Sequence, residues 1–327
     1  MEMKECPEVS IFCITYNQVD YIEECMDSIL SQKTSFKFEL LINDDCSNDG
    51  TREKIEEYAS RFPDVVKPVF HSSNQSSKGI NPTSEFLFPR AAGRYYALCE
   101  GDDFWVDDNK LQIQYDLMEK NPETMLCGHA SANVSADERK ILGLNRPFGG
   151  TGFYTFRDFV GIKQIPPMAT ASLFIRKEAY EKYVYSGYVK KPAHGDFKME
   201  MLFTALAPMA YIDKVMSAYR VLAKGSINRD IMRRRDWRDI ERKLTQTRVD
   251  YLRDMELVAP SDRIDGLSDL MDDIEYKGAL AVSDLSTLLG RWRDRFEAES
   301  LGRRAKTIVY SCFPLIQDSI RIIKSYL

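Results

Sequence analysis

The sequence has only three histidines, and its seven cysteines are scattered, without a Cys-x-x-Cys pair. The common structural zinc sites are therefore excluded. An odd number of cysteines, several of them inside apolar runs, predicts free thiols in a reducing compartment. The net charge of −5 lacks the basic excess that nucleic-acid binding needs, so we expect no nucleic-acid partner.

Long hydrophobic runs are also missing. No apolar stretch approaches the roughly 20 residues that span a bilayer, and the charged segment 1–8 lacks the apolar core of a secretory signal. We therefore expect a cytoplasmic protein. What the chain does contain is ordinary for a globular protein: 44% hydrophobic and 29% charged residues in 327 positions, enough for one large domain and an appendage.

Apolar runs alternate with amphipathic segments in the first quarter of the chain. Buried strands are expected at 9–15, 38–42 and 65–70, with helices between them. Asp20 and Glu23 resemble a capping box before the first helix. The β-α-β-α-β order predicts a parallel sheet with right-handed crossovers.

An acidic stretch follows the next predicted strand, at 95–99. Glu100, Asp102 and Asp103 lie within four positions. Carboxylates this close repel one another and are costly to dehydrate unless a cation lies among them. Oxygen ligands on a turn suit Mg²⁺ or Mn²⁺, and a phosphate often completes such a shell. The alternative is a solvated acidic turn before a helix.

Two further polar clusters follow the first and second predicted strands. They are Tyr16-Asn17 and Asp44-Asp45. Ligands of open α/β sheets bind at the carboxyl ends of the strands, so three clusters at one edge predict a binding site. Ordinary turn residues are the alternative for Asp44 and Asp45.

The next region is less regular. We expect strands at 125–134 and 170–175, an irregular excursion at 135–152, and a last edge strand or hairpin within 211–221. Asp196 opens a predicted helix, where an acid is most often a simple cap.

The last hundred residues differ from the rest. Charge-rich helical patterns in 226–300 predict an appendage, and 301–327 mixes basic with large apolar residues. The uncharged stretch Thr307–Gln317 is too short to span a bilayer but suits a helix that lies in the membrane interface. Packing on the appendage or on a second copy of the chain is the alternative.

Taken in order, the motifs of residues 9–225 resemble those of inverting family-2 glycosyltransferases with the GT-A fold. The motifs are VSIFCITYN, LLINDDCSNDGT, GRYYALCEGDDFW, KLQIQ, HGDF and the Tyr-Arg pair at 219–220. The EGDD segment is a variant of the family's Asp-x-Asp motif. The resemblance implies an α/β, mixed and mainly parallel sheet of the Rossmann-like GT-A type.

The same resemblance divides the chain. A catalytic domain would occupy 1–225, with a nucleotide-binding half at about 1–110 and an acceptor half at about 111–225. The helical appendage at 226–300 and the amphipathic segment at 301–327 would follow.

The resemblance also implies roles in binding the nucleotide sugar. Tyr16 would border or stack on the base, with Ile14 and Thr15 near it through their main chain and Asn17 anchoring the turn. Asp45 would hydrogen-bond the base, with help from Asp44.

Metal, base and acceptor roles are implied in the same way. Asp103 would hold Mg²⁺ or Mn²⁺, with Asp102 as an alternative ligand. Asp102 would also approach the ribose or sugar, and Glu100 would support the site. Asp196 would be the general base. Two acceptor-side candidates are His194, which is more often an ordinary loop histidine, and Trp105, for which core packing is an equal alternative.

Two departures from the family pattern bear on this site. Gly195 precedes Asp196 where the family often has a second acid. Val221-Leu222-Ala223 stands where many members carry a histidine that can join the metal site. A metal would therefore depend on the diphosphate and on water, and its affinity without nucleotide should be weak.

The sequence thus predicts an inverting hexosyl- or N-acetylhexosaminyltransferase. Its donor would be a nucleotide-diphosphate sugar, with UDP favoured by the family alone. Its acceptor would be a glycan or lipid-linked glycan used in surface polysaccharide synthesis, reached at the inner face of the cell membrane through 301–327. A homo-oligomer is an open alternative.

Two other functions were weighed. A sugar-phosphate nucleotidyltransferase should have a glycine-rich phosphate loop after the first strand, and TYNQVDYIEE contains no glycine. A non-catalytic binding or scaffold protein on the same fold is disfavoured because all three acidic positions are intact.

Overall fold

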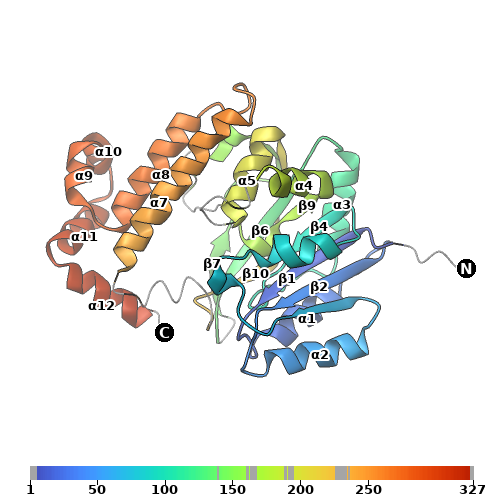
Figure 1. Ribbon diagram of the computed structural model, residues 1–327. Helices are drawn as coiled ribbons and strands as arrows, with labels where there is room; N and C mark the ends of the chain where they lie inside the picture. The colour runs from blue at the N-terminus through green and yellow to red at the C-terminus, as the bar shows by residue number, and fades with distance from the viewer. Residues whose placement is uncertain are drawn as a thin grey trace, which may run out of the picture.

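The computed structural model describes residues 6–137, 140–159, 162, 168–187, 190, 195–224, 234 and 236–324. Within them, ten strands form one sheet (Figure 1). The strands are β1 (Val9–Thr15), β2 (Phe38–Asp44), β3 (Val66–Phe70), β4 (Tyr95–Leu98), β5 (Phe104–Trp105), β6 (Leu126–Ser135), β7 (Ile141–Asn145), β8 (Gly152–Tyr154), β9 (Phe174–Arg176) and β10 (Met209–Val221).

The sheet is mixed and mainly parallel. Its order is β3-β2-β1-β4-β9-β6-β10-β5, with β7 paired to β6 and β8 to β10. The first four strands in this order are mutually parallel, and β6 is parallel to β10, whereas β9 lies antiparallel between β4 and β6. This order places the carboxyl ends of β2, β1 and β4 side by side.

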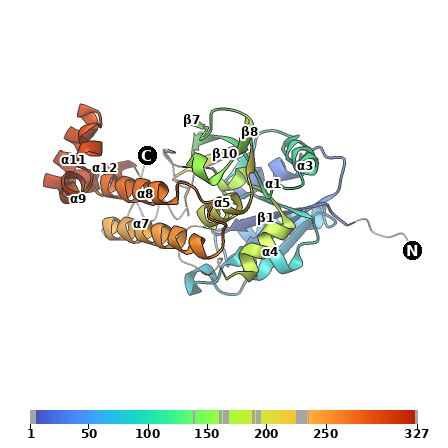
Figure 2. The same cartoon turned by 90° about the horizontal axis from the view of Figure 1, so that it is seen from above.

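Helices cover both faces of the sheet. They are α1 (Ile22–Leu30), α2 (Thr51–Arg61), α3 (Lys110–Lys120), α4 (Lys177–Tyr185), α5 (Gly195–Leu206), α7 (Trp237–Asp254), α8 (Leu267–Ala281), α9 (Leu285–Gly290), α10 (Arg293–Glu297), α11 (Leu301–Cys312) and α12 (Pro314–Lys324). Figure 2 shows α1 and α3 on one side of the sheet and α4 on the other.

Alternation along β1 explains the two layers. Val9, Ile11 and Cys13 pack into the core beneath α1, α2 and α3, whereas Phe12 points into the core that holds α4 and α5. Successive side chains of a strand point to opposite faces, so an uninterrupted apolar run is what a strand covered on both faces requires. The predicted bounds of this strand are confirmed.

The C-terminal helices lie to one side of the sheet (Figure 1). Two of them, α7 and α8, share the larger core: Val249 and Leu252 of α7 pack there with Ile274 of α8. The Tyr251 hydroxyl donates to the Lys198 carbonyl of α5 over 2.9 Å. The expected appendage is therefore helical, but its first two helices are packed onto the larger hydrophobic core beside the sheet.

The last two helices are amphipathic. One side of α12 is fixed to α7, where Arg238 Nη1 lies 2.8 Å from Asp318 Oδ1 and Trp237 Nε1 donates to the same oxygen over 2.7 Å. No helix in the described ranges is long and apolar enough to cross a membrane. The expected domain boundary at 225 lies outside the described residues.

Several local predictions were wrong. Asp20 and Glu23 form no capping box: α1 starts at Ile22 after Tyr21, without a side-chain cap, because the Asp20 carboxylate lies 4.0 Å from Lys224 Nζ and the Glu23 carboxylate pairs with Lys54.

The less regular region also differs from expectation. Residues 170–172 form a 3₁₀ turn, and only Phe174–Arg176 is a strand. The excursion at 135–152 contains β7, which pairs with β6. The expected edge hairpin is a single strand, β10, which lies inside the sheet and absorbs two register shifts between Ile212 and Ser217. A local sequence pattern does not indicate which distant strand a segment will pair with. The conformation of each of these segments depends on that pairing.

Candidate active site

The loops that follow β1, β2 and β4 meet at one edge of the sheet. The amide of Asp45 donates to Thr15 O over 3.0 Å, and the amide of Gly101 donates to Ile14 O over 3.0 Å. A Cβ on Gly101 would lie 2.5 Å from Gln18 Oε1, so only glycine fits this approach. We call Asp44, Asp45, Glu100, Asp102 and Asp103 of these loops the acidic rim.

The loop after β4 buries its carboxylates. Asp103 is fully buried: its Oδ1 accepts from the Arg220 amide over 2.9 Å, and its Oδ2 has no partner among the described residues. Burial, with the charges of Asp102 and Glu100, holds the pKa of Asp103 well above its usual range. Burial, then the charge of Asp102, raises the pKa of Glu100 to about 8.

One buried arginine lies behind this loop. Arg220, 2% exposed, donates from its guanidinium to the Asp102 carbonyl and to the Glu24 carboxylate. Its guanidinium carbon lies 4.5 Å from the ring centre of Phe104 and 5.0 Å from that of Tyr21. In the sequence, Arg220 is identified only as part of the Tyr-Arg motif, because no local pattern indicates that β10 will bury it against the acidic loop.

These groups fit a divalent cation. Arg220 is already paired with Glu24, the loop carries Glu100, Asp102 and Asp103 within four positions, and Asp103 Oδ2 is buried without a partner in the described part of the chain. Hard oxygen donors short of positive charge suit Mg²⁺ or Mn²⁺. In the described ranges, no three histidine, cysteine or acidic side chains are arranged so that they could hold a metal ion by themselves. The protein therefore offers a partial ligand set, which a diphosphate and water would have to complete.

Tyr16 and Asn17 lie where β1 ends. Tyr16 is 40% exposed, which leaves its ring free to contact a ligand. Asn17 adopts the left-handed region at φ 52°, which asparagine tolerates better than most residues. Its backbone amide donates to Ser47 Oγ over 2.8 Å, and its side-chain Oδ1 accepts from the backbone amide of Asn48 over 3.0 Å. Asn17 therefore ties the first loop to the second.

The two aspartates after β2 differ in what their oxygens do. Both carboxylate oxygens of Asp45 accept hydrogen bonds. One accepts from the backbone amide of Gln75 over 2.6 Å and the other from the backbone amide of Ser76 over 3.0 Å. Asp44 accepts from the Ser47 amide over 3.2 Å through Oδ2, and its buried Oδ1 has no described partner. Burial raises the pKa of Asp44. The free acceptor belongs to Asp44, although the family resemblance favoured Asp45.

Asp196 stands at the start of α5 and is half-buried. Its Oδ1 accepts from the Phe197 amide over 2.8 Å, and its Oδ2 accepts from Thr170 Oγ1 over 3.3 Å. After burial and the charge of Asp102, the charge of Asp196 is a further cause of the raised pKa of Glu100. Asp196 thus has the contacts of a helix cap and an electrostatic influence on the acidic rim.

The two acceptor-side candidates fare differently. Trp105 is 4% exposed, and its indole Nε1 donates to Ala171 O over 3.1 Å while Lys110 Nζ lies 4.1 Å from its ring centre. The sugar-platform role is therefore wrong and core packing is correct, because β5 pairs with β10 and turns the indole inward. His194 lies outside the described residues.

Lys110 is a second buried cation that the sequence did not single out. It is fully buried, its ammonium donates to Gln114 Oε1 over 2.8 Å, and burial lowers its pKa to about 7. Near neutral pH it therefore carries only part of a positive charge beneath the acidic loop. Its position at the first turn of an amphipathic helix is typical of a solvent-exposed lysine, so the sequence pattern did not indicate that Lys110 is buried.

The family follows from a comparison with family models. The model described as "Glycosyl transferase family 2" matches residues 10–184, more than half of the chain. The chain belongs to glycosyl transferase family 2.

Two curated relatives of this family-2 chain are informative. An uncharacterized protein of Mycobacterium tuberculosis is 39% identical over 132 residues, which cover 40% of this chain and 37% of that protein. UDP-Glc:alpha-D-GlcNAc-diphosphoundecaprenol beta-1,3-glucosyltransferase WfgD of Escherichia coli is 32% identical over 121 residues, 37% of this chain and 45% of that protein. The matched segments span less than half the length of these relatives.

Solved structures extend the likeness over the whole chain. S. aureus TarS 1–349 in complex with UDP has a TM-score of 0.59 at 14% identity and covers 98% of this chain and 89% of that one. The mannosyltransferase PcManGT of Pyrobaculum calidifontis, in complex with GDP-Man and Mn²⁺, has a TM-score of 0.58 at 15% identity, covering 99% and 87%. The family-2 chain has the GT-A fold with C-terminal helices, as its sequence predicted.

Proposed function

We propose that this family-2 chain is an inverting, metal-dependent glycosyltransferase. It moves a hexosyl or N-acetylhexosaminyl group from a UDP-sugar to a hydroxyl of a glycan or lipid-linked glycan in surface polysaccharide synthesis. The observation that carries the proposal is the buried acidic loop after β4, where Glu100, Asp102 and Asp103 lie within four positions and Asp103 Oδ2 is buried without a described partner. The UDP preference and the lipid-linked acceptor draw support from the printed name of the E. coli relative.

The residues divide the work by position. Tyr16, exposed at the end of β1, stacks on the base, and Asp44 offers its free oxygen to a base N–H group. Asp103 would hold Mg²⁺ or Mn²⁺, with Asp102 as the alternative ligand, and a cation bound there would neutralise charge on the diphosphate leaving group. Arg220 and Gly101 keep the acidic loop in place.

Asp196 performs the proton transfer. It accepts the proton of the acceptor hydroxyl while that oxygen bonds to the anomeric carbon from the face opposite the diphosphate. The bond between the anomeric carbon and the diphosphate oxygen breaks, the nucleoside diphosphate leaves, and the anomeric configuration inverts. Thr170 Oγ1, 3.3 Å from Asp196 Oδ2, orients the carboxylate.

The C-terminal helices supply a contact with the inner face of the cell membrane. Apolar side chains of the linked helices α11 and α12 are exposed; they are Leu301, Ile308, Val309, Phe313, Ile316 and Ile320. Arg303, Arg304 and Lys306 lie on α11. Apolar side chains flanked by cations favour a helix pair that lies on an anionic surface.

Vesicle sedimentation tests the membrane contact. The double substitution Ile308→Asp and Phe313→Asp should release the protein from phosphatidylglycerol vesicles. A matched control is Ile141→Asp, because Ile141 is an exposed apolar residue far from these helices, on β7. Equal sedimentation of all three proteins would contradict the contact.

A panel of nucleotide sugars tests the activity. The protein is incubated with each donor and Mn²⁺ or Mg²⁺, and the nucleoside diphosphate released is measured. We expect release from one UDP-sugar, dependent on the metal and lost in Asp103→Asn. If no donor is turned over and UDP does not bind, a scaffold function replaces the proposal.

A further inference from the structure

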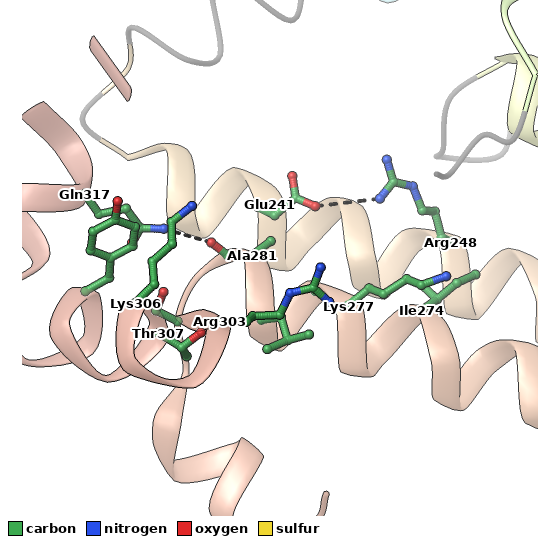
Figure 3. Close-up of a pocket in the computed structure, with 13 residues that line it drawn as sticks. Glu241, Arg248, Ile274, Lys277, Ala281, Arg303, Lys306, Thr307 and Gln317 are labelled. Atoms are coloured by element: carbon green, nitrogen blue, oxygen red, sulfur yellow. Dashed lines mark hydrogen bonds and ion pairs between the residues drawn. The ribbon is translucent and has the colours of Figure 1, made fainter. Parts of the chain in front are cut away.

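A cavity of about 460 Å³ lies between α7, α8 and the last two helices, apart from the acidic rim. Figure 3 shows Glu241 and Arg248 of α7 on one side of it and Lys277, Arg303 and Lys306 on the other. We call this cavity the basic pocket and define it by Arg248, Lys277, Arg303 and Lys306.

Cations outnumber acids in its lining. Glu241 is the one carboxylate among the described lining residues, and it lies 3.7 Å from Arg248 Nη1. Lys306 Nζ lies 5.6 Å from the Tyr310 ring centre, and no ion pair is recorded for it in the described part of the chain. The pocket therefore has positive charge that its own walls do not neutralise.

The other two cations have partners outside the lining. Lys277 pairs with Asp273, which also pairs with Arg295, and its ammonium donates to the Ile162 carbonyl. Arg303 pairs with Glu299 over 2.9 Å. If Lys277 turned toward a ligand, Asp273 would still be paired with Arg295. The exposed pair of Arg303 is weak enough for a multivalent anion to compete with it.

Arg248 connects the pocket to the active site. Its side chain is 12% exposed, and its Nε is buried without a described partner. Burial lowers the pKa of Arg248, and the carboxylates of Glu241 and Asp196 oppose that shift. The geometric link is Tyr251, one turn along α7 from Arg248: its hydroxyl donates to the Lys198 carbonyl of α5 over 2.9 Å, and Asp196 stands in the first turn of that helix.

We propose that the basic pocket binds a phosphate or diphosphate group of the acceptor. This inference rests on the proposed glycosyltransferase function, because it assigns a substrate class to the site that contains Asp196. Guanidinium groups bind phosphate oxygens in pairs, and lysine adds a mobile charge. The hydroxyls of Thr307 and Tyr310 add donors, and Ile274 supplies an apolar wall. A neutral glycan would gain nothing from this charge.

Titration with inorganic pyrophosphate tests the pocket directly. The full chain is titrated by calorimetry in EDTA, so that binding through a metal at the acidic rim is removed. Lys306→Gln should weaken pyrophosphate binding by about ten- to a hundredfold, the loss expected for one charged hydrogen bond. Arg304→Gln is the matched control: it removes the same charge from α11, outside the pocket lining, and should bind like the wild type. Wild-type affinity in Lys306→Gln and Arg303→Gln would overturn the proposal.

A second arm separates the sources of the phosphate. Phosphatidylcholine vesicles that carry a polyprenyl diphosphate are compared with vesicles of equal charge that carry phosphatidylglycerol. Both should retain the protein through α11 and α12, so the quantity compared is the additional retention on the diphosphate vesicles. Additional retention that is lost in Lys306→Gln identifies a lipid-linked acceptor. Pyrophosphate binding without additional retention identifies a soluble phosphorylated acceptor, and both results support the pocket.

The two proposals fail separately. Binding of UDP with Mn²⁺ reports on the acidic rim and not on the pocket. Pyrophosphate binding that depends on Lys306, in a protein that does not bind UDP, would leave the pocket standing and remove the glycosyltransferase proposal. UDP binding with no effect of Lys306 on pyrophosphate would do the reverse.

Discussion

The acidic rim and the basic pocket are two unbalanced charge clusters of opposite sign. In the rim, Arg220 is the buried arginine behind the acidic loop, and burial raises the pKa of Glu100, Asp102 and Asp103. The pocket is lined by four cations and one acid, Glu241, while Asp273 and Glu299 pair with two of the cations from outside the lining. The acidic rim therefore lacks positive charge, which a divalent cation would bring together with a diphosphate. The basic pocket lacks negative charge, which an anionic group of the acceptor would bring.

The two sites also differ in how they are built. Rim carboxylates are held by main-chain contacts at strand ends, such as the Arg220 amide on Asp103 Oδ1 at 2.9 Å. Pocket cations stand on helix surfaces, where side chains such as Arg303 are exposed and can move. The rim is therefore fixed before a ligand binds, and substitutions there should cost stability as well as activity. Substitutions in the pocket should mainly cost affinity.

The largest expected effect is on catalysis. Asp196→Asn should lower kcat by about 10²–10⁴-fold, because an amide cannot accept the acceptor proton, while UDP affinity stays near the wild-type value. The rate of UDP release with acceptor present measures this. The matched control, Asp116→Asn on the exposed side of α3, should retain activity. Undiminished transfer in Asp196→Asn would remove the base from the mechanism.

Next in size is the buried cation of the rim. Arg220→Met should lower the free energy of unfolding by about 3–5 kcal/mol, because it removes the guanidinium that pairs with the Glu24 carboxylate and donates to the Asp102 carbonyl. Urea unfolding measures this. Arg304→Met, on α11, is the control for loss of a less buried arginine, and its cost should stay near zero. A change below about 1 kcal/mol at Arg220 would mean that the rim does not depend on this charge.

A smaller loss is expected at the glycine of the acidic loop. Gly101→Ala places a Cβ 2.7 Å from Thr15 Oγ1 and should lower the free energy of unfolding by about 1–3 kcal/mol. It should also weaken the binding of UDP. In Gly143→Ala no atom lies within 4 Å of the new Cβ, so its unfolding free energy should change by less than about 0.5 kcal/mol. Equal melting of the two variants would show that the loop is not closely packed.

The smallest effect concerns pH. Burial lowers the pKa of Lys110 from 10.5 to about 7, so between these values the unfolded chain binds a proton that the folded protein has released. The Lys110 contribution to stability should therefore rise with pH, by about 2 kcal/mol from pH 7 to pH 9. The stability gap between Lys110→Met and the wild type should shift by this amount.

Urea unfolding at several pH values measures that gap. Lys120→Met, at the exposed end of the same helix, should show no such trend. A pH-independent gap at Lys110 would mean that the lysine stays charged and compensates part of the acidic excess of the rim.

Much of the fold was predictable because local physics dictates it. The run VSIFCIT became β1 with its expected bounds, and 38–42 became most of β2. The predicted order of strands and helices also indicated that the first strands of the sheet are parallel. What failed depended on distant partners: β9 is antiparallel because it pairs with β4 and β6, and Phe174–Arg176 alone reaches them.

The site shows the same division. The positions of the acidic residues at strand ends could be predicted, because the carboxyl ends of parallel strands meet at one edge. The burial of Arg220 and Lys110 could not, because a charged residue gives no local sign that it will be enclosed. Nor could the roles of the two aspartates be separated, since Asp45 is occupied by amides of residues 75 and 76, thirty positions further along the chain.

The central claim is that the acidic rim binds a nucleotide diphosphate and a divalent cation together. Calorimetric titration of UDP, with Mn²⁺ and with EDTA, tests it in the wild type and in Asp103→Asn. The wild type should bind UDP at least about tenfold more tightly with Mn²⁺ than with EDTA, and Mn²⁺ alone should bind weakly, because the protein supplies only part of the ligand set. Asp103→Asn should abolish the difference. Equal affinity for UDP with and without Mn²⁺, or an unchanged metal effect in Asp103→Asn, would contradict the account.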